Sequence, residues 1–251
     1  MSKLFSLSFF CLFLLAIPAL AHNVAAQDAD FIKQNPGALF VPFIYLGAKH
    51  MVTGYDHLLF LFGVIFFLYR MKDVAVYVTC FAVGHSITLL SGVLTGIHVN
   101  PFIIDAIIGL SVVYKAFDNL NGFKTLLGFQ PNTKAMVLLF GLFHGFGLAT
   151  KLQELKLSSN GLVGNMISFN VGVEIGQLVA LSIILLFMTW WRSTQSFAKL
   201  AVAANVIIMT AGFILMGYQL GGYYVEQTTA KDAAILRSMP LVARAVEGSV
   251  R

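Results

Sequence analysis

The chain carries ionisable side chains inside long apolar segments. A charged group at the middle of a membrane helix costs about 2.5 to 3.5 kcal/mol on insertion scales, so a bundle that contains several normally uses them. Imidazole nitrogens combined with carboxylate oxygens suit Zn, Ni, Co or Fe, whereas Mg and Ca sites are built from oxygen. The candidate metal ligands are His50, Asp56, His57, His85, Asp105, His144 and Glu174, with Asn170 and Gln177 as supporting amides.

The depth of these residues in their predicted helices indicates one shared site. Four of them lie near the middle of their segments: His57, His85, His144 and Glu174. At a rise of 1.5 Å per residue they fall at similar levels, so we expect all four within ligand distance of one point. His50 lies two helical turns before His57, on nearly the same face and roughly 10 Å away in a continuous helix. We therefore expect His50 above the shared point, as an earlier stop for an ion.

Two of the carboxylates have more than one interpretation. Asp56 points about 100° away from His57 on a helix, so it is either an orienting partner of the imidazole, an interhelical hydrogen-bond partner or a ligand. Asp105 stands near a helix start, where a carboxylate is also favourable as an N-terminal charge. A ligand role and a structural role both stay open for it.

The remaining polar residues are interpreted from helical spacing. Asn170, Glu174 and Gln177 share one helix face at i, i+4 and i+7, which would allow the two amides to orient the carboxylate. A single intramembrane histidine such as His85 is often only a packing residue. Because several helices supply histidine or carboxylate at one depth, the pattern favours a binding site.

The composition indicates that transmembrane helices position these candidate ligands. Of 251 residues, 58% are hydrophobic and 11% are charged, against about 45 to 50% apolar and about 25% charged in soluble domains. The net charge of +5 comes from scattered Lys and Arg residues, so we expect a lipid bilayer and no nucleic acid as partner. We predict an all-α polytopic membrane protein, a bundle of about six transmembrane helices, with spans near 51–69, 74–95, 101–120, 134–151, 162–189 and 201–221.

The two ends of the chain fit a protein of the bacterial inner membrane. Residues 1–21 contain Lys3, an apolar stretch and small residues at Ala19 and Ala21, which is typical of a cleaved signal peptide. We assign 22–36 to a short periplasmic segment, 37–224 to the transmembrane bundle and 225–251 to a polar C-terminal tail. Lys and Arg are concentrated in the predicted cytoplasmic loops, so both termini should be periplasmic. An oligomeric state or an accessory subunit is not predicted by the sequence.

Four motifs resemble those of the HupE/UreJ family of membrane proteins. They are HMVTGYDHLLFL from His50 to Leu61, GHSITL from Gly84 to Leu89, FGLFHGFGLA from Phe140 to Ala149, and FNVGVEIGQ from Phe169 to Gln177. The resemblance implies a nickel or cobalt permease associated with hydrogenase or urease maturation. It also implies that the functional residues include His50, Asp56, His57 and His144.

The sequence departs from this family at two acidic positions. Asp105 and Asp118 stand where glutamate is expected in many relatives, which shortens the reach of each carboxylate by one methylene. The resemblance therefore leaves the ion open, with zinc still possible. Copper is disfavoured because Met and Cys do not accompany the histidines.

Two other functions compete with transport. An intramembrane zinc hydrolase that acts on a lipid would also combine three histidines with a carboxylate, and Ser86 beside His85 is compatible with it. A membrane accessory protein that binds metal without transporting it has the same sequence signature. We expect a transporter and no enzymatic activity.

Overall fold

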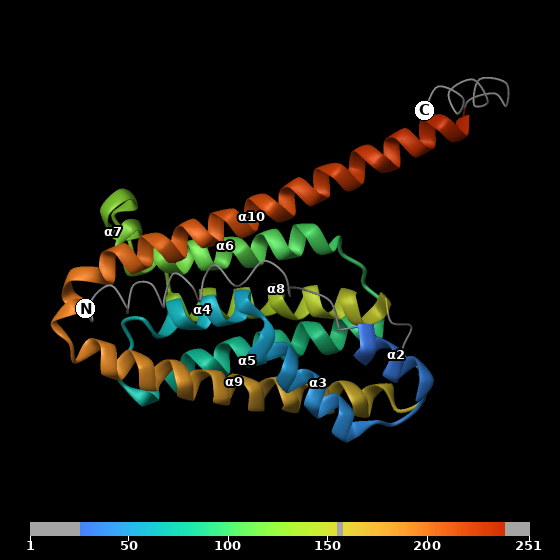
Figure 1. The fold of residues 1–251 in the computed structure, drawn as a ribbon, viewed down its shortest axis with the longest axis horizontal. Coiled ribbons are helices and arrows are strands. Elements are labelled where there is room, and N and C mark those ends of the chain that lie inside the picture. Colours follow the sequence, from blue (N-terminus) through green and yellow to red (C-terminus); the bar gives the residue numbers. More distant parts are fainter. Residues whose placement is uncertain (1–25, 155–157, 239–251) are drawn as a thin grey trace.

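The computed structural model describes residues 26–154 and 158–238. The predicted signal peptide and the last part of the predicted tail lie outside these ranges. The described part is all-helical (Figure 1). Its helices are α2 (Ala26–Gln34), α3 (Phe40–Thr53), α4 (Tyr55–Ile65), α5 (Met71–Thr95), α6 (Pro101–Asn119), α7 (Gly122–Leu127), α8 (Thr133–Glu154), α9 (Leu162–Arg192) and α10 (Gln195–Ser238).

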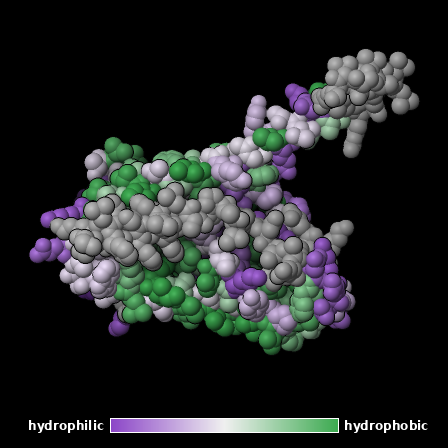
Figure 2. All heavy atoms as spheres, in the orientation of Figure 1, coloured by the Kyte–Doolittle hydropathy of each residue, from purple (hydrophilic) through white to green (hydrophobic). Residues whose placement is uncertain are grey.

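Four of these helices are long and apolar enough to cross a membrane, so the chain is a multi-pass membrane protein. The candidate spans are Lys72–Thr95, Thr133–Gln153, Leu162–Arg192 and Gln195–Ile235. Apolar side chains cover much of the visible bundle, and hydrophilic residues gather mainly toward its ends (Figure 2). The other two predicted spans have a different form: α6 carries buried charges, and the first one is broken into α3 and α4.

The chain breaks at Gly54, inside the predicted first span near 51–69, and a separate helix, α3, precedes the break. Gly54 ends α3 and begins α4 with an extended backbone, φ −72° and ψ 99°. A Cβ atom on Gly54 would lie only 2.6 Å from Nδ1 of His57 and 3.1 Å from the carbonyl oxygen of His50. Glycine at this position therefore allows the two histidine-bearing segments to meet.

Glycines also set the contact between α3 and α9. A Cβ on Gly47 would lie 2.0 Å from the carbonyl oxygen of Phe169, and one on Gly172 would lie 2.0 Å from that of Ile44. Small residues allow membrane helices to approach this closely. Because Ile44 meets Gly172 and a later residue, Ala48, meets Gly176, α3 and α9 run in the same direction.

Helices α5 and α8 form a second close pair, also parallel. A Cβ on Gly141 would lie 2.5 Å from the carbonyl oxygen of Phe81, and one on Gly145 would lie 2.2 Å from that of His85. Helices α6 and α10 form a third pair and run antiparallel to each other. Gly109 of α6 packs against the backbone of Met216 of α10. In each pair a glycine allows the two helix backbones to approach closely.

Helix α10 is far longer than a membrane span. Its 44 residues measure about 66 Å at 1.5 Å per residue, against a hydrocarbon core of roughly 30 Å. The C-terminal part of α10 projects well beyond the other helices (Figure 1). The predicted polar tail is thus a continuation of α10 as far as Ser238.

Candidate metal centre

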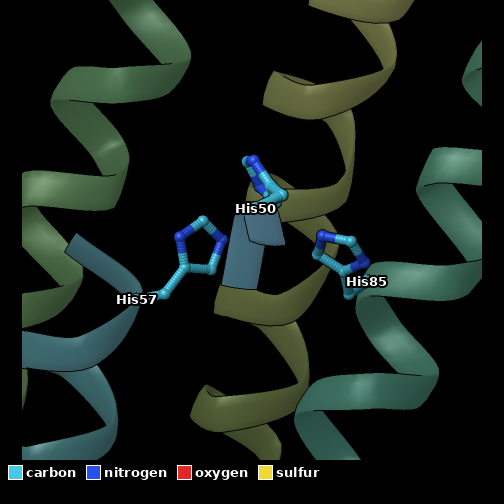
Figure 3. A group of neighbouring side chains, drawn as sticks. All are labelled: His50, His57 and His85. Carbon is cyan, nitrogen blue, oxygen red and sulfur yellow. The ribbon is translucent and has the colours of Figure 1, made fainter. Parts of the chain in front are cut away.

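Three histidines from three helices come together inside the bundle. His50 belongs to the last turn of α3, His57 to the first turn of α4 and His85 to the middle of α5. One ring nitrogen from each lies within 4.8 Å of the others, and Figure 3 shows the three rings gathered around one region. His57 and His85 are buried and His50 is half-buried. The spacing fits one ion shared by three imidazoles.

A fourth histidine lies against this group. The ring centroid of His144, on α8, is 4.8 Å from that of His57, and its side chain is buried. The close packing of Gly145 on the backbone of His85 brings α8 against α5 beside this group. Ser111 Oγ lies 3.4 Å from Nε2 of His144, a long contact. His144 is therefore a direct neighbour of the group of three.

The histidines retain nitrogen atoms with no hydrogen-bond partner among the described residues. These atoms are Nε2 of His50, Nε2 of His57, both ring nitrogens of His85 and Nδ1 of His144. A buried polar atom without a partner costs about 1 to 3 kcal/mol. A cluster of such atoms is what a site for an ion with nitrogen ligands requires, because each ligand must offer a free lone pair.

Asp56 fixes the orientation of His57. Its Oδ1 accepts a hydrogen bond from Nδ1 of His57 at 2.9 Å and another from the backbone N–H of the same residue at 2.9 Å. A carboxylate on one ring nitrogen sets the tautomer and makes the other nitrogen a better ligand. This geometry matches the orienting role among the predicted alternatives for Asp56.

Aromatic side chains line the histidine group. The ring centroid of Phe81 is 5.0 Å from that of His144 and 6.3 Å from that of His57, and the ring of Phe169 is 6.1 Å from that of His50. Both phenylalanines are buried. An apolar shell of this kind limits the access of water to a metal site.

The predicted position of His50 is wrong. It lies in the group of three, and its ring centroid is 5.0 Å from that of His57 instead of roughly 10 Å above it. The prediction assumed one continuous helix, whereas the chain breaks at Gly54 and turns His57 back beside His50.

The predicted position of Glu174 is also wrong. Its side chain is exposed, so it does not join His57, His85 and His144 at a shared point. Helix α9 turns a stripe at three- and four-residue spacing toward the bundle, and Glu174 lies outside that stripe. The buried residues of the stripe are Asn165, Met166, Phe169, Gly172, Val173, Gly176, Gln177, Ala180 and Leu181.

The two predicted supporting amides, Asn170 and Gln177, are less exposed than Glu174. Gln177 is 1% exposed, and both polar atoms of its amide have no hydrogen-bond partner in the described part of the chain. Asn170 is half-buried, and its Oδ1 is likewise unpartnered. Gln177 faces the interior and Glu174 faces outward. The Gln177 amide therefore does not orient the Glu174 carboxylate, contrary to the prediction from the sequence.

Asp105 lies in an ion pair outside the histidine group. Its carboxylate oxygens accept hydrogen bonds from Nζ of Lys151 at 3.0 and 3.2 Å. At the other end of α6, Nζ of Lys115 lies 2.5 Å from Oδ2 of Asp118, and both side chains are buried. Sequence reasoning missed the Asp105 pair because its members are 46 residues apart and only the packing of α6 on α8 joins them.

One comparison with known proteins identifies a family. The family described as HupE / UreJ protein matches residues 26–227, a range that includes all four clustered histidines. No curated protein and no solved structure matches the chain.

Proposed function

This chain belongs to the HupE/UreJ family, and on that premise we propose that it transports nickel or cobalt ions across the bacterial inner membrane. The family is associated with the uptake of these metals. The observation that carries the proposal is the set of buried, unpartnered imidazole nitrogens from α3, α4, α5 and α8.

The donor set supports a borderline transition metal as the substrate. Imidazole binds Ni²⁺, Co²⁺ and Zn²⁺ well and Mn²⁺ more weakly, in the order Mn < Co < Ni for a given site. The nitrogen atoms of His50, His57 and His85 replace part of the water shell of the ion, and His144 offers a further position beside His57.

Polar groups along α6 support a route through the bundle. Asp105 lies near its first turn, Ser111 near His144 in its middle, and Asp118 near its last turn. An ion moves from the carboxylate end to the histidines and leaves toward the Asp118 end. A chain that crosses the membrane six times in alternating directions would have α3 parallel to α9, α5 parallel to α8, and α6 antiparallel to α10. The three pairs of helices that meet at glycines have these directions.

The hydrolase alternative has less support from the site. A zinc hydrolase needs a group beside the metal-bound water that can accept its proton. The carboxylate next to the histidines, Asp56, already accepts two hydrogen bonds from His57, and Glu174 is exposed. The transport reading uses the same residues without requiring a free base.

Uptake into proteoliposomes tests the proposal directly. Vesicles that contain the purified protein are given Ni²⁺, Co²⁺, Zn²⁺ or Mn²⁺ outside, and the metal inside is measured over time. We expect uptake of Ni²⁺ or Co²⁺ above that of empty vesicles, and its loss in His57→Ala. The exposed loop residue His98 supplies the matched control, since His98→Ala should transport as the parent does. Tight binding without any accumulation would contradict transport and leave a metal-binding accessory protein.

A further inference from the structure

The amide of Gln177 is a deeply buried polar group that the folded chain leaves unsatisfied. The side chain is 1% exposed, and neither Oε1 nor Nε2 has a hydrogen-bond partner among the described residues. Burying an amide without a partner is costly. The buried amide of Asn205, by contrast, donates to the carbonyl oxygen of Ala201 and accepts from Nδ2 of Asn119, both at 2.9 Å. Gln177 therefore offers a donor and an acceptor to a group from outside the chain.

Gln177 stands at the same level of the bundle as the histidine group. A Cβ on the preceding residue, Gly176, would lie 2.6 Å from the carbonyl oxygen of Ala48 and 3.0 Å from Cβ of Met51. These two residues lie on either side of His50 in α3. Successive residues of a helix differ in height by only about 1.5 Å. Gln177 and His50 are consequently at closely similar heights in their two parallel helices.

The face of α9 that carries Gln177 is the face that meets the histidines. Phe169, Val173 and Gln177 follow one another at four-residue intervals and are all buried, so they share one side of the helix. The ring centroid of Phe169 is 6.1 Å from that of His50. Helix α9 also contacts α4 and α5, which carry the other two histidines of the group of three. Gln177 therefore faces the interior between α3, α4 and α5.

The amide and the imidazoles do not satisfy each other. Nε2 of His50, Nε2 of His57 and both ring nitrogens of His85 have no hydrogen-bond partner in the described part of the chain, as is the case for the Gln177 amide. An ion held by three imidazoles keeps water in a remaining position. The ion makes this water a strong hydrogen-bond donor, and an amide oxygen is a suitable acceptor for it. A hydrated ion would thus satisfy both sets of atoms.

We propose that Gln177 is a binding residue for the metal ion, and that its amide oxygen accepts a hydrogen bond from a water that the ion retains beside the histidines. The imidazoles hold the ion, and the amide holds its water. The inference deepens the proposed function and rests on it, because the ion is the one that the histidine group binds. Gln177 then acts on the hydrated ion instead of on Glu174.

Gln177→Leu tests this role with Ni²⁺ as the probe. Leucine fills nearly the same volume without a polar atom, so the metal-free protein should unfold at a temperature higher by about 2 °C or more. Its affinity for Ni²⁺ should nevertheless fall by about 10 to 100-fold, because a group that orients a ligand of the ion is lost. Calorimetric titration of the full, detergent-purified chain measures the affinity, and thermal unfolding without metal measures the stability.

Gln177→Glu should move both quantities in the opposite direction. The carboxylate accepts the same hydrogen bond from the metal-bound water and adds a negative charge, so Ni²⁺ should bind at least as tightly as in the parent. Without metal, the buried charge should lower the unfolding temperature. A side chain that only fills space would not combine a gain in stability with a loss of affinity.

Asn205→Leu is the matched control. It also replaces a buried amide by leucine, but this amide makes two hydrogen bonds within the bundle. The substitution leaves Asn119 without one of its partners, so the unfolding temperature should fall. The affinity for Ni²⁺ should stay that of the parent, because Asn205 belongs to α10 and not to the helices of the histidine group.

The inference is overturned by any of three results. Gln177→Leu could bind Ni²⁺ as tightly as the parent, its metal-free form could unfold at or below the temperature of the parent, or Gln177→Glu could lose as much affinity as Gln177→Leu. Each of these would show that the amide serves the fold and not the ion. Failure of the proposed function has a different signature, namely Ni²⁺ binding that is unchanged by His57→Ala, and the inference would fall with it.

Discussion

Nδ1 of His57 lies 2.9 Å from Oδ1 of the preceding residue, Asp56, and both side chains are buried. Neighbours in a chain rarely share such a bond in the middle of a helix, where they diverge by about 100°. Here the pair stands in the first turn of α4, directly after the break at Gly54. The carboxylate holds one nitrogen of the ring, and the other, Nε2, has no hydrogen-bond partner in the described part of the chain.

Removing a central imidazole should abolish binding of the metal. We expect no measurable Ni²⁺ or Co²⁺ binding for His57→Ala and for His144→Ala, because each change removes a bond and opens the geometry of the site. Calorimetry on detergent-purified protein measures binding, with thermal unfolding measured beside it. If both variants bind as the parent does and differ only in stability, the histidines are packing residues.

Asp56→Asn should weaken binding without abolishing it. The amide oxygen can still accept the hydrogen bond from Nδ1 of His57, but the negative charge is lost. Changes of this kind in a partner of a metal-binding histidine cost about 10 to 100-fold in affinity. The same calorimetric titration measures the loss. A complete loss would instead assign Asp56 as a direct ligand.

Gly54→Ala should damage the site more than the fold. Its φ of −72° suits alanine, but the added Cβ would lie 2.6 Å from Nδ1 of His57 and displace the ring. We expect a loss of Ni²⁺ affinity of at least about tenfold with a smaller change in thermal stability. Gly217→Ala is the control, because a Cβ there meets nothing within 4 Å. Equal affinities for the two variants would show that the break does not position His57.

Acid should release the metal. Only neutral imidazole offers a lone pair, so protons compete with the ion for His50, His57 and His85. Affinity should fall once the pH is low enough to protonate these imidazoles. Titrations of Ni²⁺ at a series of pH values measure this. Affinity that does not change at any pH at which the protein stays folded would show that imidazoles are not the ligands.

Glu174→Gln should leave Ni²⁺ binding unchanged. Its carboxylate is exposed on the outer side of α9 and is not part of the histidine group. His85→Ala, tested in the same titration, should lose binding because His85 is buried within that group. A loss in Glu174→Gln as large as that in His85→Ala would restore the sequence-based ligand assignment.

The sequence predicted the helical class and the clustering of His57, His85 and His144, because ionisable groups in apolar segments are recognisable without a structure. It could not predict the break before His57. Gly54 lies in an apolar helical pattern, and one glycine is tolerated in many helices. The position of His50 depended on that break and was therefore wrong.

The error at Glu174 has a different cause. The sequence predicts the depth of Glu174 along α9, but depth does not define which side of a helix faces the bundle. That side is set by Gly172 and Gly176, which pack against α3. The Lys151 to Asp105 pair was missed for a related reason, since only the tertiary packing of α8 on α6 brings the two together.

The pairing of helices fixes an order of assembly. Asn165 of α9 donates a hydrogen bond to the carbonyl oxygen of Gly37, 128 residues earlier in the chain, just before α3. Helix α3 cannot make this contact until α9 has been synthesised. A chain released after α8 would already contain every clustered histidine but would lack the surface that holds His50 in place. Metal binding should consequently appear during synthesis only once α9 has inserted.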